Sequence, residues 1–206
     1  PLANRHVRVM LEDRQGDFWI GTNREGLYRL AQASGRWIHY THHQADPAGL
    51  ANNTITSLLE TPGGELWIGT DRGLHRYDPH SGRVLLHKAP ALAQDIITAI
   101  ITPDLPENEA EETLWIGTLD GLKIFTPSRG QVTILQQNAT DPRGLRTNNI
   151  LSLFQDRSGI VWIGVENGGI NKYDHKKNRF HFLGHRQLGL DDPEEYTIRA
   201  ILHSRR

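Results

Sequence analysis

Four short turns in the sequence carry polar and charged side chains that could recognise a ligand. Each turn follows closely on a Trp-Ile-Gly triplet and ends in glycine, but its other residues differ from one copy to the next. Such side chains donate and accept hydrogen bonds, and variable polar turns on a repeated frame are typical of a recognition surface. The alternative is that they are ordinary solvated turns. The candidate ligand-binding residues are Asn23, Arg24, Asp71, Arg72, Asp120, Glu166 and Asn167.

Carboxylates and imidazoles also occur in patterns that bind metals in other proteins. Residues 104–112 contain five acidic side chains whose oxygens could ligate Ca²⁺, but they lack the spacing of an EF-hand loop. A solvated hairpin tip is therefore favoured. His39, His42 and His43 lie close together in sequence without carboxylates at a metal-site spacing, so we expect surface histidines. The sequence predicts no metal site and no cofactor.

No sequence pattern supports catalysis. There is no phosphate-binding glycine loop and no Gly-x-Ser-x-Gly segment. Cysteine is absent, which excludes thiolate zinc sites and a cysteine nucleophile. Asp13 and Asp156 begin Asp-x-x-Gly-x-x-Trp segments, where we expect each carboxylate to accept backbone hydrogen bonds within its own turn. We therefore expect a protein that is not an enzyme.

Composition excludes further classes of function. The net charge of −1 provides no basic excess for a nucleic-acid backbone, so we expect no nucleic-acid partner. No apolar stretch approaches the roughly 18 residues of a membrane-spanning helix. Residues 1–10 contain no apolar signal-peptide core, and the first residue is Pro1, so we expect a piece cut from a longer protein.

A repeat of 47 or 48 residues organises the chain. Trp-Ile-Gly occurs four times, and each copy lies between turns rich in glycine, aspartate and serine. The short apolar runs between these turns alternate with period two, which predicts four strands per repeat and almost no helix. The repeated residues are Trp19, Trp67, Trp115 and Trp162 with Gly21, Gly69, Gly117 and Gly164.

Four-stranded units of this length are typical of β-propeller blades. We expect an all-β fold with four four-stranded antiparallel blades within one fragment, residues 1–206. The blades are predicted at about 5–41, 53–89, 95–137 and 149–184, and residues 196–203 resemble the first strand of a fifth. Each repeated tryptophan would fill the space between adjacent blades, and the glycine after it would allow close packing.

The blades could close as a small ring, but an arc of a larger ring, about seven-bladed, is favoured because the chain stops inside a blade. Such an arc would expose apolar blade faces, so self-association is possible.

The repeated residues resemble the two-component regulator propeller repeat. The resemblance lies in Gly64-Glu-Leu-Trp-Ile-Gly-Thr70 followed by Gly73-Leu74 and Tyr77-Asp78, and in Asp156-Arg-Ser-Gly-Ile-Val-Trp-Ile-Gly164 followed by Tyr173-Asp174. It covers nearly the whole chain. The third copy departs from the pattern, with an insertion at 103–112 and Thr126 in place of aspartate.

The resemblance implies a function that the spacing alone does not. Such repeats form the extracytoplasmic sensor region of bacterial membrane receptors whose output is usually a histidine kinase and sometimes a diguanylate cyclase. Several members respond to oligosaccharides. The expectation is a non-catalytic, periplasmic sensor module whose partners are an oligosaccharide or other small ligand and neighbouring receptor domains. The alternatives are an interaction or assembly scaffold without a small ligand and, from another class, a glycan-processing or lyase propeller.

Overall fold

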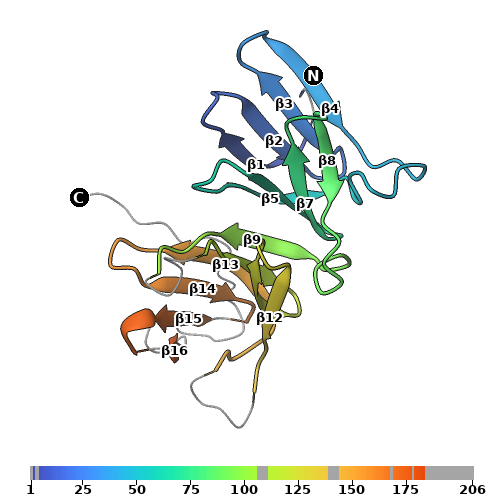
Figure 1. The fold of residues 1–206 in the computed structure, drawn as a ribbon. Coiled ribbons are helices and arrows are strands. Elements are labelled where there is room, and N and C mark those ends of the chain that lie inside the picture. Colours follow the sequence, from blue (N-terminus) through green and yellow to red (C-terminus); the bar gives the residue numbers. More distant parts are fainter. Residues whose placement is uncertain are drawn as a thin grey trace. The chain divides into compact units, whose positions relative to one another are not determined.

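The computed structural model describes residues 2, 5–105, 111–138, 144–167, 169–177 and 179–183. These residues form four four-stranded antiparallel sheets (Figure 1), as the repeat predicts. The described helical structure is one 3-10 turn, η2 (His175–Lys177). The predicted strand at 196–203 lies outside the described residues, as do Glu107 and Glu109 of the acidic run. Within the described part, no helix is long and apolar enough to cross a membrane.

The chain divides into two compact units, Pro1–Ile97 and Thr98–Arg206, and each holds two of the sheets apart from one residue of β9. In unit 1, blade 1 consists of β1 (Val7–Glu12), β2 (Phe18–Thr22), β3 (Leu27–Ala31) and β4 (Arg36–Tyr40). Blade 2 consists of β5 (Ile55–Glu60), β6 (Leu66–Thr70), β7 (Leu74–Asp78) and β8 (Arg83–Leu86). The strands of each blade pair in sequence order.

Unit 2 repeats this arrangement. Blade 3 consists of β9 (Ile97–Ile101), β10 (Leu114–Thr118), β11 (Gly121–Thr126) and β12 (Gln131–Leu135). Blade 4 consists of β13 (Ile150–Gln155), β14 (Val161–Val165), β15 (Gly169–Asp174) and β16 (Arg179–Leu183). Since the Trp-Ile-Gly triplets lie on β2, β6, β10 and β14, they occupy the second strand of every blade.

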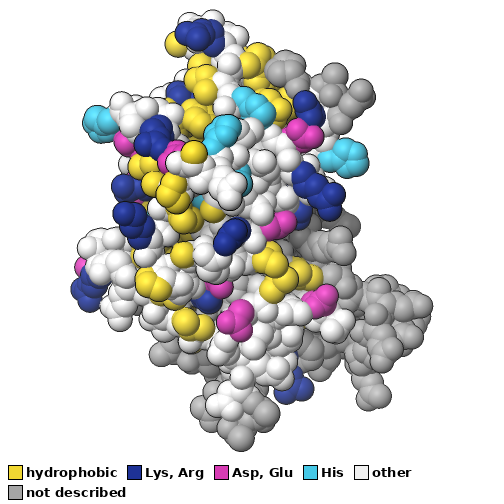
Figure 2. Space-filling view, turned by 90° about the vertical axis from the view of Figure 1, so that its right-hand side faces the viewer, with side chains coloured by type: hydrophobic (Ala, Val, Ile, Leu, Met, Phe, Trp, Pro, Cys, Tyr) yellow, Lys and Arg dark blue, Asp and Glu magenta, His cyan; other side chains and the backbone are white. Residues whose placement is uncertain are grey.

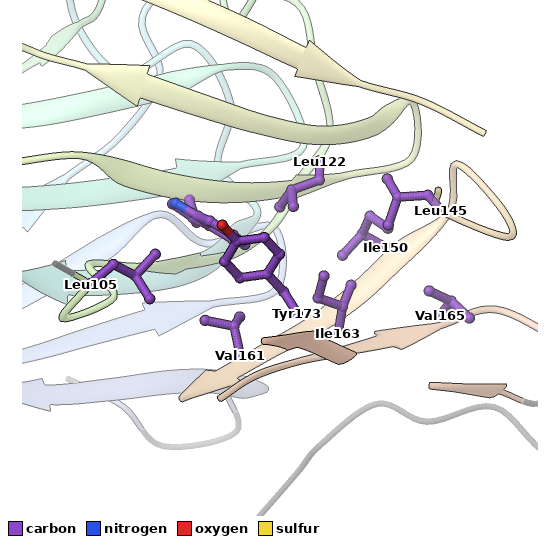
Figure 3. Packing of buried hydrophobic residues seen from close by; sticks show 9 residues of the cluster. Leu105, Leu122, Leu145, Ile150, Val161, Ile163, Val165 and Tyr173 are labelled. Atoms are coloured by element: carbon purple, nitrogen blue, oxygen red, sulfur yellow. The ribbon is translucent and has the colours of Figure 1, made fainter. Parts of the chain in front are cut away.

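Two of the four repeated tryptophans, Trp19 and Trp115, pack against an aromatic side chain of the neighbouring blade, as predicted. In unit 1 the fully buried Trp19 ring lies 4.8 Å from the ring of Tyr77 in blade 2, with an interplanar angle of 62°. In unit 2 the Trp115 ring lies 5.1 Å from that of Tyr173 in blade 4, at 58°. Figure 3 shows Tyr173 among the apolar side chains of this second joint. The same aromatic pair therefore builds the joint in both units.

The glycine of each triplet sets how closely the blades approach. A Cβ atom added at Gly21 would lie 2.6 Å from Cγ2 of Ile55, the first residue of β5. One added at Gly117 would lie 2.8 Å from Cγ2 of Ile150, the first residue of β13. Real Cβ atoms do not come this close to their neighbours, so a larger residue would push the blades apart. This confirms the close-packing role predicted for these two glycines.

A basic side chain lies over the repeated tryptophan in three blades, a feature that we did not predict. The cation belongs to the residue directly opposite the tryptophan on the third strand. Arg29 lies 5.2 Å from the ring centre of Trp19, Arg76 lies 5.9 Å from that of Trp67, and Lys172 lies 5.7 Å from that of Trp162. In blade 3 the position is taken by Ile124. Cations over an indole face stabilise such pairs by about 0.5–2 kcal/mol.

The carboxylates of Asp13 and Asp156 bind their own turns, as predicted, and also the repeated tryptophan. Asp13 Oδ1 accepts hydrogen bonds from the backbone N–H groups of Gln15 and Asp17 at 3.0 and 2.9 Å, and Oδ2 accepts one from Trp19 Nε1 at 2.7 Å. Asp156 Oδ2 likewise accepts from Trp162 Nε1 at 2.7 Å. The tryptophan bond explains why aspartate stands six residues before the indole.

Candidate ligand-binding face

The predicted recognition turns all join the second and third strands of a blade, so they lie at one end of their sheets. In three blades, the backbone N–H of the first turn residue donates a hydrogen bond to the residue just before the first strand of the same blade. The N–H of Asn23 donates to His6 O at 2.8 Å, that of Asp71 to Thr54 O at 3.2 Å, and that of Glu166 to Asn149 O at 3.0 Å.

In blades 1 to 3, the backbone N–H of the glycine that ends the turn donates a hydrogen bond to the linker that enters the next blade. The N–H groups of Gly26 and Gly73 donate to Asn53 O and Asp95 O, each at 2.8 Å, and that of Gly121 donates to Asn148 O at 2.7 Å. These glycines have φ values of +82°, +90° and +103°, the left-handed region that favours glycine. Within each unit, the turns and the linkers therefore lie at the same end of the sheets, and we call this end the turn face of the unit.

The predicted site residues are placed differently on this face. Asn23, Arg24 and Arg72 are exposed in unit 1, whereas Asp71 is half-buried. In unit 2, Asp120 is exposed and accepts a hydrogen bond from Gln136 Nε2 at 2.8 Å, and Asn167 is exposed with φ +67°. Glu166 is half-buried and accepts a hydrogen bond from Asn149 Nδ2. The carboxylates of Glu166 and Asp120 thus already accept hydrogen bonds from other side chains of the protein.

A cleft of about 660 Å³ opens on the turn face of unit 1, and Arg72 is the predicted residue that lines it. Its walls are the linker before blade 2, the β6–β7 turn and the linker after blade 2. The lining residues are His42, Gln44, Asp46, Pro47, Ala51, Arg72, Leu86, Ala93 and Gln94. The linker residues of this cleft were not predicted, because polar linkers carry no motif that marks a cleft.

The charged groups of the cleft are held in defined positions. Arg72 Nε donates to Gln94 Oε1 at 2.9 Å. The carboxylate of Asp46 forms an ion pair with Arg83, whose hydrogen bond lowers the pKa of Asp46 below its usual value. The cleft thus combines an anchored guanidinium, a carboxylate that already has a cation, and the neutral amides of Gln44 and Gln94.

A buried histidine supports the wall of this cleft. Nε2 of His75, on β7, accepts a hydrogen bond from the N–H of Ala51 at 2.9 Å, which requires the neutral ring. The side chain is fully buried, and burial lowers the pKa of His75 to about 4. In blade 4 the equivalent Asn171 Nδ2 donates to Gly144 O in the linker before that blade, at 3.4 Å. Polar residues on the third strand therefore hold the linkers in place.

A second cavity, of about 450 Å³, lies at the opposite end of the unit 1 sheets, beside the β1–β2 and β5–β6 turns. Both of its lining arginines already form ion pairs, Arg29 with Asp17 and Arg76 with Glu65. Arg29 Nη1 also donates to the Tyr77 hydroxyl at 2.5 Å. This cavity was not predicted, and its internal ion pairs leave it less suited to a polar ligand.

The histidines that we considered as metal ligands are used within the fold. His39 stacks on Tyr28 with ring centres 4.0 Å apart, and His42 Nδ1 bonds to Leu50 O at 2.7 Å. Among the described residues, no group of three or more His, Cys, Asp or Glu side chains is arranged to hold a metal ion. Figure 2 shows basic and acidic side chains interspersed on one face, without a patch of one sign among its described residues.

Comparison with known families assigns the repeat. Residues 1–24, 49–72 and 144–167 match the model described as two component regulator propeller. Three segments of the chain are thus similar to the two component regulator propeller repeat. Each matched segment runs from a linker through a first strand and a Trp-Ile-Gly strand into a turn of the turn face. No match covers the corresponding segment of blade 3, where the insertion interrupts the pattern.

Solved structures that are similar to the chain include extracellular domains of two component systems. The extracellular domain of the hybrid two component system BT3049 from B. thetaiotaomicron is 26% identical, with a TM-score of 0.68 over 89% of this chain and 24% of that one. The corresponding domain of BT4673 from B. thetaiotaomicron is also 26% identical, with a TM-score of 0.67 over 87% of this chain and 22% of that one. This propeller chain thus spans about a quarter of their length.

More distant structures share the fold alone. Virginiamycin B lyase from Staphylococcus aureus is 16% identical, with a TM-score of 0.59 over 86% of this chain and 55% of that one. No curated protein sequence matches the chain significantly.

Proposed function

We propose that this propeller is a non-catalytic ligand-recognition module of a two-component-type signalling receptor, with an oligosaccharide as its ligand. The observation that carries the proposal is the turn face, where variable polar turns on a constant frame are bonded to the linkers and border a cleft of about 660 Å³. Ligand sites are typically clefts of this size with a few convergent polar groups. The similarity to extracellular domains of hybrid two component systems supports a sensor role.

The position of the cleft suggests how binding could be transmitted. Both linkers that flank blade 2 contribute to its walls, and hydrogen bonds from Gly26 and Gly73 join these linkers to the turns. A ligand that prefers one arrangement of the linkers would shift the protein toward that arrangement. Neighbouring receptor domains would respond to this shift, and no chemistry in the propeller is needed.

The chemistry of the cleft supports the non-catalytic part of the proposal. Glycoside hydrolysis ordinarily needs two carboxyl groups flanking the scissile bond. Among the described lining residues of the cleft, Asp46 is the one carboxylate, and it is held by Arg83. We place the module on the extracytoplasmic side, in the periplasm, by analogy with the extracellular domains to which it is similar.

A thermal-shift screen with oligosaccharides tests the proposal, since a ligand that binds the folded state raises the melting temperature. We expect at least one oligosaccharide to raise it in a concentration-dependent manner. Arg72→Gln should weaken that shift, whereas Arg157→Gln, an exposed arginine in the β13–β14 turn at the other end of its blade, should not. If no oligosaccharide stabilises the protein, or if turnover of a glycan is detected, the proposal is wrong.

An apolar surface on blade 1 favours a second candidate function, an interaction with another protein surface. Met10, Phe18 and Trp37 are 68%, 39% and 39% exposed. By strand alternation they lie on the face of the sheet opposite Trp19, and therefore point away from blade 2. Exposed large apolar side chains gathered on one face are typical of interaction sites.

A further inference from the structure

We infer that the ligand of the unit 1 cleft carries a carboxylate group, as in an oligosaccharide that contains uronic acid, and that Arg72 binds this group. The inference rests on the proposed function, because it specifies the chemical class of the oligosaccharide. It depends on how Arg72 is held and on the charges that surround it.

Arg72 is fixed at two points. Its backbone N–H donates to Thr70 Oγ1 at 2.9 Å, and the fully buried Thr70 hydroxyl donates to Gly73 O at 3.1 Å. Its side-chain Nε donates to Gln94 Oε1 at 2.9 Å. Within the described part of the chain, the two terminal nitrogens have no hydrogen-bond partner. An anchored guanidinium with free terminal nitrogens matches the two oxygens of a carboxylate.

The charge balance of the cleft favours an anion. Asp46 is the lining carboxylate, and Arg83 compensates its charge. No ion pair engages Arg72 among the described residues. The bound state therefore has one cation to neutralise, which suits a single carboxylate. A doubly charged phosphate would keep an unpaired charge there.

The remaining lining suits a neutral, hydroxylated scaffold. The side-chain amides of Gln44 and Gln94 can both donate and accept hydrogen bonds, as sugar hydroxyls require. Pro47, Leu86 and Ala93 supply apolar surface for the carbon faces of sugar rings. One carboxylate together with several hydroxyl groups describes a uronate-containing oligosaccharide better than an acidic peptide.

Isothermal titration of the chain with three probes tests this inference. The probes are an acidic trisaccharide of galactose in which one residue is replaced by galacturonate, the neutral trisaccharide of galactose, and a glutamate-containing tripeptide. We expect the acidic trisaccharide to bind more tightly than the neutral one by about tenfold or more, the difference that one charge-assisted contact supplies. Its affinity should fall with added salt. The tripeptide should bind weakly, because it lacks the hydroxyl groups.

Matched variants assign the binding to Arg72. Arg72→Gln should lose about tenfold or more in affinity for the acidic trisaccharide, Arg72→Lys should lose less, and the control Arg157→Gln should bind normally. Unchanged melting temperatures would show that the variants are folded. Equal binding of neutral and acidic sugars, or unaltered binding by Arg72→Gln, would overturn the inference and leave the proposed function intact. Preference for the tripeptide would overturn both. If none of the oligosaccharides binds, the proposed function itself fails.

Discussion

Individual side chains in this propeller combine two tasks that usually fall to different residues. Asp13 closes its own turn through Oδ1 and holds the indole of Trp19 through Oδ2. Arg29 lies over the same indole and binds Asp17. Trp19 is fully buried where blades 1 and 2 meet. A change in the turn or in the ion pair should therefore also affect the packing between the two blades. Burial also raises the pKa of the neighbouring Tyr40 to about 12.

Replacement of Asp13 should show this linkage. We expect Asp13→Ala to lower the free energy of unfolding by about 2 kcal/mol, because a buried indole N–H and two turn amides lose their acceptor. Asp13→Asn keeps one acceptor and should cost less. Urea unfolding followed by tryptophan fluorescence measures both. An effect of Asp13→Ala no larger than that of Asp104→Ala, which changes an exposed side chain, would contradict the assigned role.

The buried His75 should make stability depend on pH. Because its pKa is lowered from 6.5 to about 4, the unfolded chain binds more protons between these values. Its contribution to stability is therefore complete above pH 6.5 and is lost as the pH falls toward 4, by about 3 kcal/mol in all.

The variant His75→Gln separates this effect from other titrations. The glutamine oxygen can replace Nε2 as the acceptor for Ala51 and does not titrate in this range. Urea unfolding at several pH values between 4.5 and 7 should show a flatter pH dependence for His75→Gln than for the unchanged chain. The exposed His6→Gln should keep the original slope. Equal slopes for all three proteins would show that His75 does not titrate as proposed.

At the scale of the elements, the contact between neighbouring blades is built in the same way in both units. Trp19 with Tyr77 and Trp115 with Tyr173 have ring distances within 0.3 Å of each other, the difference between 4.8 and 5.1 Å. Gly21 and Gly117 lie against Ile55 and Ile150, the first residue of the first strand in the next blade. A blade therefore presents its tryptophan and glycine to the next blade, and the next blade presents an aromatic residue and an isoleucine in return.

Gly21→Ala should test the joint in unit 1. Its added Cβ would approach Ile55 Cγ2 to 2.6 Å and Val9 Cγ1 to 2.7 Å. We expect a loss of about 1–3 kcal/mol in the free energy of unfolding from overpacking. The double variant Gly21→Ala/Ile55→Ala should lose less than the sum of its single variants, because Ile55→Ala removes the clashing methyl group. Additive losses would show that Gly21 does not limit the approach of the blades.

The sequence predicted these elements because they recur, and it missed what does not recur. Trp19 and Gly21 stand at the same place in every copy, so a period and a size class suffice to place them. The contact between Arg29 and Trp19 was not predicted, because the equivalent residue in blade 3 is Ile124 and the repeat is therefore not constant at this position. Only the pairing of β2 with β3 places Arg29 opposite Trp19. The cleft escaped notice for a similar reason. Gln94 and Asp46 lie in linkers of unlike sequence, and they meet Arg72 only in the folded chain.

At the scale of the whole molecule, the described residues form four like blades. The chain covers 24% and 22% of the extracellular domains to which it is similar. Closure into a larger ring of about seven blades remains a prediction. An incomplete ring exposes a blade face, and the apolar side chains Met10, Phe18 and Trp37 on blade 1 fit such a face.

Self-association of this chain follows from that exposure. We expect sedimentation to show concentration-dependent dimerisation, since apolar faces of this kind associate in water. The double variant Met10→Lys/Trp37→Lys should weaken it by about tenfold or more, because it places charges on the contact. The control Ile134→Lys changes an equally exposed residue, 46% exposed, on blade 3 and should have no such effect. A monomer at every concentration, or equal effects of both variants, would contradict the prediction.

Recognition of a ligand on the turn face can be tested by amide chemical-shift mapping of the chain with an oligosaccharide from the thermal-shift screen. We expect perturbed amides in the turns that contain Asn23, Arg24, Asp71 and Arg72 and in the linkers at 42–51 and 93–95. Perturbations confined to the opposite turns, at 13–16, 61–64 and 156–159, would contradict it.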